Sequence, residues 1–306
     1  MSSRSKPISS RLYLSLLVFF VIGSLVMPAR GQADGPDRRI AYKQTVDAKG
    51  NEVTLHLHVF LPEGAAEGDS RPAIVFFFGG GWVGGAPTQF YPHCAELASR
   101  GVFAAAAEYR VHSRHGTMPQ ACVADGKSAV RYLRQHAEEL GIDPDRIAAG
   151  GGSAGGHVAA ATALVTGFEE QGEDQDISSR PDLLVLFNPV IDTTPPNGFG
   201  WQRMGDDAEE LSPIEGVYAE QPPSVIFHGK ADTTTPIDSV RRFKAASERV
   251  QAVCVLHEYD GAAHGFFNMR DQNNPDARPN RYYHATVEQM LGFLDDRGYL
   301  PQDEAK

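Results

Sequence analysis

The hydrophobic positions along the chain follow two patterns, and the first is found near the amino terminus. From Val53 to Leu61 apolar residues alternate with polar ones, which is the pattern of a strand with one buried face. A similar segment at 39–46 precedes it, and the linker between them contains Gly50 and Asn51. Two such runs joined by a short turn predict an antiparallel hairpin.

After Pro72 the apolar residues come in short continuous runs, which is typical of strands buried on both faces of a parallel sheet. The runs are AIVFFF (73–78), VFAAAA (102–107), RIAAG (146–150), LLVLF (183–187), SVIF (224–227) and CVLHEY (254–259). Stretches of helical composition lie between most of them, at about 88–100, 120–139, 154–166, 236–250 and 280–297. This alternation predicts an α/β fold, with a doubly wound, mostly parallel sheet that begins with the antiparallel hairpin.

One segment breaks the alternation. Residues 193–222 are rich in proline, glycine and acidic side chains and contain no strand-like run. We interpret the segment as an insertion over one end of the sheet. Because the sequence contains no internal repeat, no low-complexity tract and no sign of a second domain, a single domain is expected over residues 34–306.

The amino terminus has the composition of a targeting segment. Arg4, Lys6 and Arg11 precede a sixteen-residue apolar run at 12–27, and small residues follow in ARGQA (29–33). This pattern predicts a secretory signal peptide over residues 1–33. The run is shorter than the ~20 residues that a membrane-crossing helix needs. We therefore expect export to the periplasm or medium and no stable membrane association after cleavage; a retained membrane anchor is the alternative.

Charge and cysteine content limit the partners, disulfides and metal sites that the chain can have. The formal net charge is −11, which argues against nucleic acid or an anionic membrane as a partner. The three cysteines, Cys94, Cys122 and Cys254, are too few and scattered for a disulfide framework or a zinc motif, and we expect them to be buried. His112 and His115 have no third ligand nearby in sequence. No metal and no cofactor are predicted.

A serine surrounded by glycines is the main candidate for chemistry. Gly151-Gly152-Ser153-Ala154-Gly155 fits the pattern G-x-S-x-G between a predicted strand and a predicted helix. At such a junction a tight turn projects the serine hydroxyl above the end of the sheet. The motif alone also fits a glycine-rich phosphate loop or a tightly packed turn.

A nucleophilic serine needs a base and an acid that orients the base. On this type of sheet they follow in the order serine, acid, histidine. Asp232 comes after the penultimate strand and His264 after the last one, at strand ends where open α/β sheets place their sites. We predict Ser153 as nucleophile, His264 as base and Asp232 as acid. Asp192 is the alternative acid, and His228 is expected to be structural.

The oxyanion formed in such a reaction needs hydrogen-bond donors. Gly79-Gly80-Gly81 follows the first buried strand. The backbone N–H groups of Gly80 and Gly81, together with that of Ala154, are the predicted donors. A tight strand exit is the alternative reading of the glycines. Because elbow, acid, base and donor loop occur in the expected order, the pattern predicts a serine hydrolase.

These motifs resemble one known family. FGGGW (78–82), EYR (108–110), GGSAGGH (151–157), HGKADTTTP (228–236) and GAAHGFF (261–267) are similar to motifs of α/β-hydrolases of the acetyl-esterase and hormone-sensitive-lipase-like type, near bacterial acetylxylan and feruloyl esterases. The resemblance extends from about Ile40 to Tyr299. Phe78 stands where the family has a histidine that braces the donor loop. Arg110 and Asp125 match family positions and are expected to form a structural pair.

The resemblance implies a serine carboxylesterase that acts on short-chain, acetyl-type esters, with a small-molecule or oligosaccharide ester as substrate. Trp82, next to the donor loop, is expected to wall the acyl side. Three alternatives remain at this stage: a prolyl-oligopeptidase-like peptidase, an arylformamidase, and a non-catalytic binding protein with the hydrolase fold. The sequence makes no prediction of oligomeric state.

Overall fold

The computed structural model describes residues 35–270 and 280–301, all within one compact unit, Gln32–Lys306. The strands are β1 (Arg38–Val46), β2 (Glu52–Phe60), β3 (Arg71–Phe77), β4 (Phe103–Ala107), β5 (Ile142–Gly152), β6 (Leu183–Phe187), β7 (Ser224–Gly229) and β8 (Cys254–Tyr259). The α-helices are α1 (Tyr91–Ser99), α2 (His112–His115), α3 (Pro119–Gln135), α4 (Ala137–Leu140), α5 (Ala154–Leu164), α6 (Trp201–Met204), α7 (Asp238–Arg249) and α8 (Arg281–Asp295). Short 3-10 helices are η1 (Pro87–Phe90), η2 (Gly205–Asp207) and η3 (Pro213–Gly216). The predicted signal peptide lies outside the described residues.

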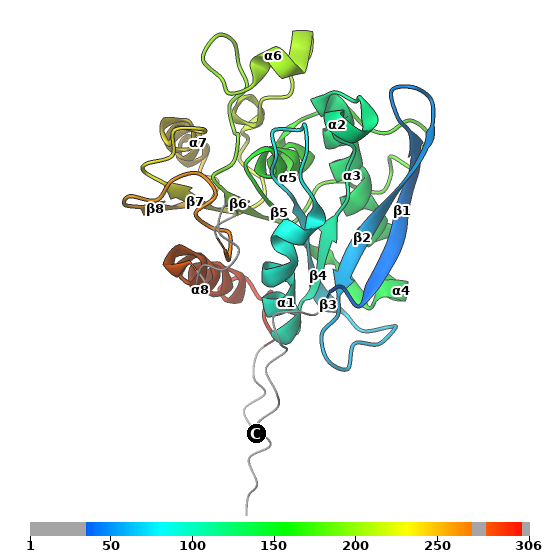
Figure 1. Cartoon of the computed structure of the whole chain (residues 1–306). Coiled ribbons are helices and arrows are strands. Elements are labelled where there is room, and N and C mark those ends of the chain that lie inside the picture. Colours follow the sequence, from blue (N-terminus) through cyan, green and yellow to red (C-terminus); the bar gives the residue numbers. More distant parts are fainter. Residues whose placement is uncertain (1–34, 271–279, 302–306) are drawn as a thin grey trace, which may run out of the picture. The chain divides into compact units, whose positions relative to one another are not determined.

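The strands form one sheet in the order β1-β2-β4-β3-β5-β6-β7-β8 (Figure 1). β2 runs antiparallel to both of its neighbours, β1 and β4. The pairs from β4 to β8 are parallel. The predicted fold class, a mostly parallel sheet with an amino-terminal antiparallel hairpin, is confirmed. No helix among the described residues is long and apolar enough to cross a bilayer.

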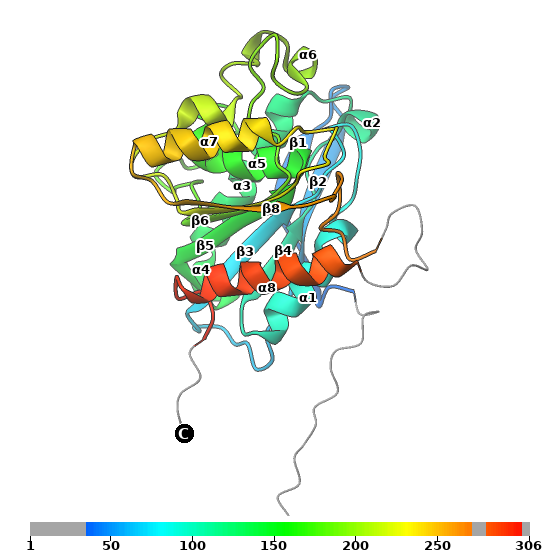
Figure 2. The same cartoon turned by 90° about the vertical axis from the view of Figure 1, so that its left-hand side faces the viewer.

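Helices cover both faces of the sheet, which explains the continuous apolar runs. α3, α5 and α7 lie on one face and α1 and α8 on the other (Figure 2). Along β6, Leu184 and Leu186 pack into the core of the first face, whereas Leu183, Val185 and Phe187 pack into that of the second. Every position of such a strand is buried, and each fully buried side chain of this size stabilises the fold by about 1.5–3 kcal/mol.

The predicted pair of Arg110 and Asp125 is confirmed, and it is part of a larger buried network. Arg110 Nη2 lies 2.8 Å from Asp125 Oδ1, and Lys43 Nζ from β1 lies 2.7 Å from the same oxygen. Glu170 pairs with both cations. Because these groups come from β1, from the end of β4, from α3 and from a later loop, they fasten the hairpin to the rest of the domain. The Asp125 side chain is fully buried, so it requires these partners.

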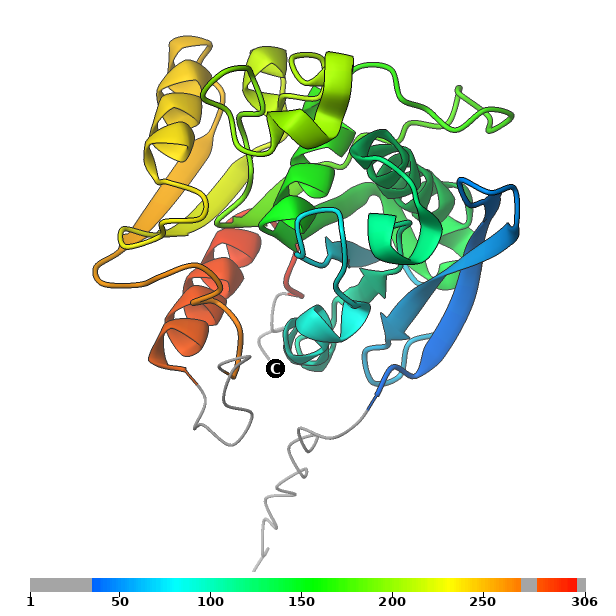
Figure 3. The same ribbon diagram turned by 45° about the horizontal axis from the view of Figure 1, so that its top comes forward.

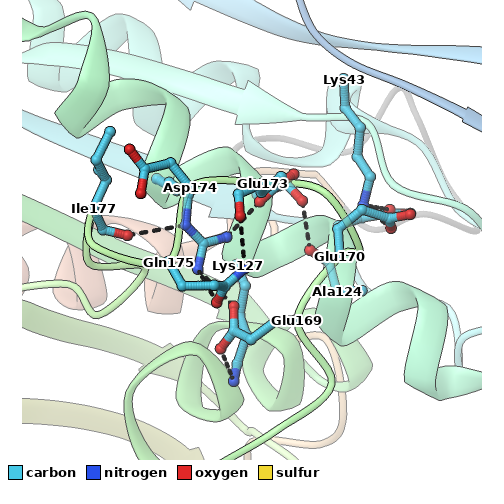
Figure 4. Close-up of polar contacts among 12 residues, drawn as sticks. Lys43, Ala124, Lys127, Glu169, Glu170, Glu173, Asp174, Gln175 and Ile177 are labelled. Atoms are coloured by element: carbon cyan, nitrogen blue, oxygen red, sulfur yellow. Dashed lines mark hydrogen bonds and ion pairs between the residues drawn. The ribbon is translucent and has the colours of Figure 1, made fainter.

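The acidic segment that follows α5 is held on α3, the helix that also carries Asp125. Lys127 Nζ on α3 lies 2.7 Å from Glu169 Oε1 (Figure 4), and Arg131 Nη2 lies 2.6 Å from Glu169 Oε2. Glu173 also pairs with Arg131. The cationic side chains are almost fully buried and the carboxylates about three-quarters buried. Two carboxylates of this segment, those of Glu169 and Glu173, are therefore paired with cations of α3.

The segment 193–222 contains α6, η2 and η3 and no strand, as expected for an insertion. It lies beside the carboxyl end of the central strands (Figures 1 and 3). Met204 and Leu211 anchor it in the core. Phe199 and Arg203 reach the same cavity as Ser153. The insertion therefore forms one wall of the candidate site.

Candidate active site

Ser153 sits on a strained turn between β5 and α5. Its φ is +56°, in the left-handed region that costs a non-glycine residue free energy. A Cβ at Gly151 would lie 2.3 Å from the carbonyl oxygen of Gly155, and one at Gly155 would lie 2.1 Å from that of Phe77. Only glycine fits at these two positions. The Ser153 N–H donates to the Phe187 carbonyl over 3.0 Å, which fixes the turn to β6.

Ser153, His264 and Asp232 form one hydrogen-bonded set. His264 Nε2 lies 3.0 Å from Ser153 Oγ, and His264 Nδ1 lies 2.7 Å from Asp232 Oδ2. Both distances are those of good hydrogen bonds. Because the carboxylate can only accept at neutral pH, Nδ1 carries the proton and Nε2 accepts from the serine hydroxyl. The structure thus brings together the three residues predicted from separate strand ends.

The Asp232 carboxylate is buried and charged. Burial alone would raise its pKa, but hydrogen bonds from His264 and from the backbone and side chain of Thr235 outweigh this effect, and the pKa is lowered. The N–H groups of Thr234 and Thr235 donate to Oδ1 over 2.8 and 3.0 Å, and Thr235 Oγ1 donates to Oδ2 over 2.9 Å. The acid therefore stays ionised at neutral pH and is held in one orientation.

Asp192, the alternative acid, has other partners. Its Oδ1 accepts from the Thr194 N–H over 2.9 Å and from the Thr194 hydroxyl over 2.6 Å. Its Oδ2 pairs with Arg242 over 2.6 Å. Asp192 thus caps a turn at the start of the insertion and makes no hydrogen bond to His264 within the described residues.

The glycine loop passes directly beside the serine. A Cβ at Gly79 would lie 3.3 Å from Ser153 Cβ. The Gly79 N–H donates to Gln89 Oε1 over 2.6 Å, whereas those of Gly80 and Gly81 donate no hydrogen bond within the described part of the chain. The Ala154 N–H is at the positively polarised start of α5. All three predicted donors therefore lie in segments adjoining Ser153.

An aromatic pair braces the glycine loop where the family has a histidine. The ring of Phe78 stacks on that of Tyr109, with 4.1 Å between ring centroids. Tyr109 Oη also donates to the Phe78 carbonyl over 2.5 Å. Both residues are almost fully buried. The start of the loop is thus fixed by packing and by one hydrogen bond.

The expectation that Trp82 walls the acyl side is wrong. Trp82 has a φ of +61° and is buried, and it is not among the residues that line the cavity beside Ser153. Its Nε1 donates to His157 Nδ1 over 3.3 Å, and His157 Nε2 donates to the Leu211 carbonyl over 2.8 Å. The strand-exit turn directs the indole under the insertion. Trp82 therefore supports the wall instead of forming its surface.

Comparison with known proteins places the chain in a family. The solved structure of the apo form of Thermogutta terrifontis esterase 2 is 42% identical to this chain, with a TM-score of 0.80, and the alignment covers 87% of this chain and 96% of that one. The chain belongs to the α/β-hydrolase esterase family. The BD-FAE family model matches residues 57–204, and that of the dienelactone hydrolase family matches residues 210–294. The protein is a carboxylic ester hydrolase of this family.

Curated relatives are more distant. Esterase LipQ of Mycobacterium tuberculosis is 29% identical over 76% of this chain and 59% of its own length. A probable isoprenylcysteine alpha-carbonyl methylesterase of Arabidopsis thaliana, ICMEL1, is 25% identical over 72% and 51%, respectively. The chain spans about half the length of the curated relatives it matches. Thermogutta terrifontis esterase 2 has also been solved with propionate, with butyrate and phosphorylated by paraoxon.

The site of this esterase includes polar residues that the sequence did not single out. Asn188, directly after β6, has its amide nitrogen 3.1 Å from His264 Nδ1. Gln89 Nε2 donates to Asn268 Oδ1 over 3.1 Å, so Gln89 connects the glycine loop to the loop that carries His264. The position of Asn188 after a buried strand was a usable signal. Gln89 lies in the short helix η1 and Asn268 in an irregular segment, and neither position carries such a signal.

A cavity of about 1230 Å³ opens beside Ser153 and His264. Its other walls come from the glycine loop, from η1 and its flanks, from the insertion and from residues 265–270. His228 lies next to Thr235 and is fully buried. Its Nε2 donates to the Thr235 carbonyl over 2.7 Å, and its Nδ1 has no partner within residues 35–270 and 280–301. The described residues contain no group of three or more side chains suited to hold a metal ion. The three cysteines are free and buried, as predicted.

Proposed function

We propose that this esterase hydrolyses short-chain, acetyl-type esters of carbohydrates through an acyl-enzyme on Ser153. One observation carries the catalytic part of the proposal: Ser153, His264 and Asp232 are joined by hydrogen bonds of 3.0 and 2.7 Å at the mouth of a cavity. Distances of this kind are those that a nucleophile, its base and the orienting acid require.

In the proposed mechanism Ser153 Oγ attacks the ester carbonyl while His264 Nε2 takes its proton. The negative charge of Asp232 stabilises the imidazolium that forms. The N–H groups of Gly80, Gly81 and Ala154 donate to the oxyanion. The imidazolium then protonates the leaving alcohol oxygen as the carbon–oxygen bond breaks. A water molecule, deprotonated by His264, attacks the acyl-enzyme in the same way and releases the acid and free Ser153.

The acyl and alcohol preferences rest on different observations. A short acyl group is supported by the esterase of Thermogutta terrifontis, which has been solved with propionate and with butyrate. Segment 193–222 has few of the large aliphatic residues that a lipid-binding cap would bury. An alcohol part of sugar size is supported by the volume of the cavity and by the resemblance to acetylxylan and feruloyl esterases.

The nucleophile is tested by Ser153→Ala. The variant should fold normally and lose at least a thousandfold in kcat for p-nitrophenyl acetate, because the residual rate would come from binding and the oxyanion donors alone. Ser239→Ala removes an exposed serine hydroxyl on α7 and serves as the control. Retention of more than about a tenth of the wild-type rate would contradict the assignment.

The acid is tested by comparing Asp232→Asn with Asp192→Asn. The first change removes the charge that selects the His264 tautomer and should lower kcat by roughly 10³–10⁴. The second should change kcat by less than about threefold, because Asp192 does not contact His264. The reverse order would show that the acid follows the earlier strand.

Labelling identifies the nucleophile without turnover. Paraoxon should transfer one diethylphosphoryl group to the peptide that contains Ser153, as expected from the related esterase that has been solved phosphorylated by paraoxon. Mass spectrometry should find no adduct on Ser153→Ala.

A chain-length series of p-nitrophenyl esters, measured beside an acetylated xylo-oligosaccharide, tests the substrate preference. A higher kcat/KM for octanoate than for acetate, without acetate release from the sugar, would contradict a carbohydrate acetylesterase.

We also propose that the enzyme is exported. The proposal rests on the basic and apolar residues of segment 1–33. Expression of the full chain in a bacterium should yield a soluble extracytoplasmic enzyme whose first residue is Gln32 or Asp34. Recovery of the unprocessed chain in the membrane fraction would support the alternative, a retained anchor.

A further inference from the structure

The cavity beside Ser153 has a charge opposite to that of the chain. The chain has 39 acidic and 28 basic residues. The described residues that line the cavity include Arg203 and Arg270 and no aspartate or glutamate. Binding of an apolar or neutral substrate would not explain why an acidic protein has arginines and no carboxylates along this cavity. A cavity with a net positive lining concentrates anionic ligands.

Arg203 is held at the edge of the glycine loop. Its Nη1 donates to the Gly81 carbonyl over 3.0 Å. A Cβ at Gly81 would lie only 2.6 Å from Nη1, so a side chain at position 81 would force the guanidinium away. The same loop contains the proposed donors to the oxyanion. The guanidinium therefore has a defined place close to the proposed reaction centre.

The backbone around Arg203 is anchored. The Arg203 N–H donates to the Gly200 carbonyl over 2.9 Å. Gln120 on α3 donates from Nε2 to the Met204 carbonyl over 2.9 Å and to Asp207 Oδ2 over 2.8 Å. Met204 itself is buried in the core. Although the Arg203 side chain is exposed, the short helix that carries it is fixed to α3.

Most of the hydrogen-bonding capacity of this guanidinium is unused. A guanidinium has five N–H donors, and that of Arg203 makes one hydrogen bond within the described residues, to Gly81. No carboxylate there lies within ion-pair distance of it, although Asp206 and Asp207 follow closely in the sequence. The planar fork of arginine matches a carboxylate, which it can bind through two parallel hydrogen bonds.

We propose that Arg203 binds a carboxylate of the substrate, and that the preferred substrates are acetyl esters of acidic alcohols such as uronic acid sugars. This inference rests on the proposed function, because an acyl group as short as acetyl cannot itself carry the carboxylate. The negative charge therefore belongs to the alcohol part.

The test compares two esters of similar size, 4-acetoxybenzoate and 4-acetoxybenzamide, which differ in the charge of the group opposite the acetyl ester. Wild-type enzyme should prefer the benzoate in kcat/KM. Arg203→Gln should reduce kcat/KM for the benzoate about ten- to a hundredfold, mainly through KM, and leave the benzamide nearly unchanged. Arg241→Gln removes an exposed arginine of α7 that pairs with Glu258 on β8 and does not line the cavity, and it should retain the wild-type ratio.

Salt and natural-type substrates extend the test. The preference for the benzoate should decrease between 10 mM and 500 mM NaCl, because salt screens an exposed pair. The O-acetylated methyl glycoside of galacturonic acid, with its carboxylate unesterified, should be preferred over O-acetylated methyl galactoside. Calorimetry on Ser153→Ala should show tighter binding of the benzoate than of the benzamide, a result that does not depend on turnover.

Each other outcome overturns the inference. Equal kcat/KM for the two esters in wild-type enzyme, or an unchanged ratio in Arg203→Gln, would show that Arg203 does not recognise the charge. An equal loss for both esters would show that Arg203 acts by holding the Gly81 loop. Turnover of 4-acetoxybenzamide by the wild-type enzyme reports on the proposed function alone, so the two failures are distinguishable. If neither ester is hydrolysed and neither binds Ser153→Ala, both proposals fail.

Discussion

At the scale of single residues, Asn188 gives the His264 ring a contact that the triad itself does not provide. The Asn188 amide nitrogen lies 3.1 Å from Nδ1 and 3.5 Å from Nε2 of His264. An atom at similar distances from both ring nitrogens lies against the face of the ring, since in the plane it would collide with the carbon between them. Asn188 is fully buried with a φ of +33°, and its N–H donates to Phe227 over 2.7 Å. We expect it to restrict the tilt of the imidazole.

Asn188→Gly tests this role. Glycine adopts a positive φ without strain, so the turn is kept while the amide is removed. The variant should lose about tenfold in kcat with KM unchanged, because the ring samples orientations from which Nε2 cannot reach Ser153. Steady-state kinetics and urea unfolding, measured together, separate the effects. A lower free energy of unfolding with an unchanged kcat would show that Asn188 is only a packing residue.

The residues of the site differ in how well the sequence identified them. Ser153, Asp232 and His264 could be predicted because residue type, chain order and strand ends all agree. Asn188 also follows a strand, but asparagine is common in turns, so its type carried no further information. The error at Trp82 has a geometric cause, since the positive φ of that residue sends its ring inward. No pattern in the sequence announces such a turn.

At the scale of elements, the apolar runs predicted every strand of the sheet, but not its order. β2 pairs with β4 in antiparallel orientation, and β3 lies between β4 and β5. β3 is joined to β4 and β5 by the crossovers that parallel strands need, so strands adjacent in the sheet need not follow one another in the sequence. One helix was expected over 120–139, and the structure has two, since α3 ends at Gln135. Composition supports helix throughout this region and gives no sign of the break.

The loop between β3 and η1 is the element whose support should matter most for catalysis. Tyr109→Phe removes the hydroxyl that donates to the Phe78 carbonyl. Tyr42→Phe is a matched control, because Tyr42 Oη donates to a carbonyl over 2.6 Å in the same way, but to that of Glu108, next to Tyr109, and not to the glycine loop itself. Each change leaves a carbonyl without its donor and should lower the free energy of unfolding by about 1–3 kcal/mol.

Only Tyr109→Phe should reduce catalysis. A loosened glycine loop holds the Gly80 and Gly81 N–H groups less well at the oxyanion, so kcat should decrease about tenfold with little change in KM. Kinetics on both variants with p-nitrophenyl acetate provide the comparison. Equal kcat values in the two variants would mean that stacking with Phe78 alone supports the loop.

At the scale of the whole molecule, composition gives the net charge, but not how charges pair inside the described residues. Lys127 and Glu169 are 42 positions apart and meet only because the segment after α5 returns to α3. Arg110 and Glu170 are likewise far apart in the sequence and are brought together by the same returning segment. Such pairs depend on the path of irregular segments. Hydrophobic patterns, by contrast, are local, and this is why the core could be predicted, whereas of the ion network only the Arg110–Asp125 pair was expected, from the family resemblance.

The molecule also carries a buried titratable group that the proposed chemistry does not use. His93 on α1 is fully buried, and neither of its ring nitrogens has a hydrogen-bond partner among the residues that the structure describes. The rings of Phe90, Phe187 and Tyr283 surround it, with centroids 5.0–5.2 Å away. Burial lowers the pKa of His93 from 6.5 to about 3. The neutral ring is therefore trapped in an apolar core.

This group should make the whole domain sensitive to acid. Below pH 6.5 the unfolded chain binds a proton at position 93 that the folded protein does not bind until about pH 3. The contribution of His93 to the free energy of unfolding is thus largest above pH 6.5 and decreases as the pH falls, by up to about 1.4 kcal/mol per unit.

His93→Phe and His93→Leu remove the titration and the two unpaired nitrogens. Urea unfolding at pH 7, 6, 5 and 4 should show a smaller loss of stability for both variants than for wild-type enzyme, whereas His284→Phe, at an exposed position of α8, should retain the wild-type slope. The dependence of the free energy of unfolding on pH distinguishes titration from packing, because a packing defect in one variant shifts its stability equally at every pH. Identical pH dependence in all four proteins would mean that a proton acceptor for His93 exists in the folded state.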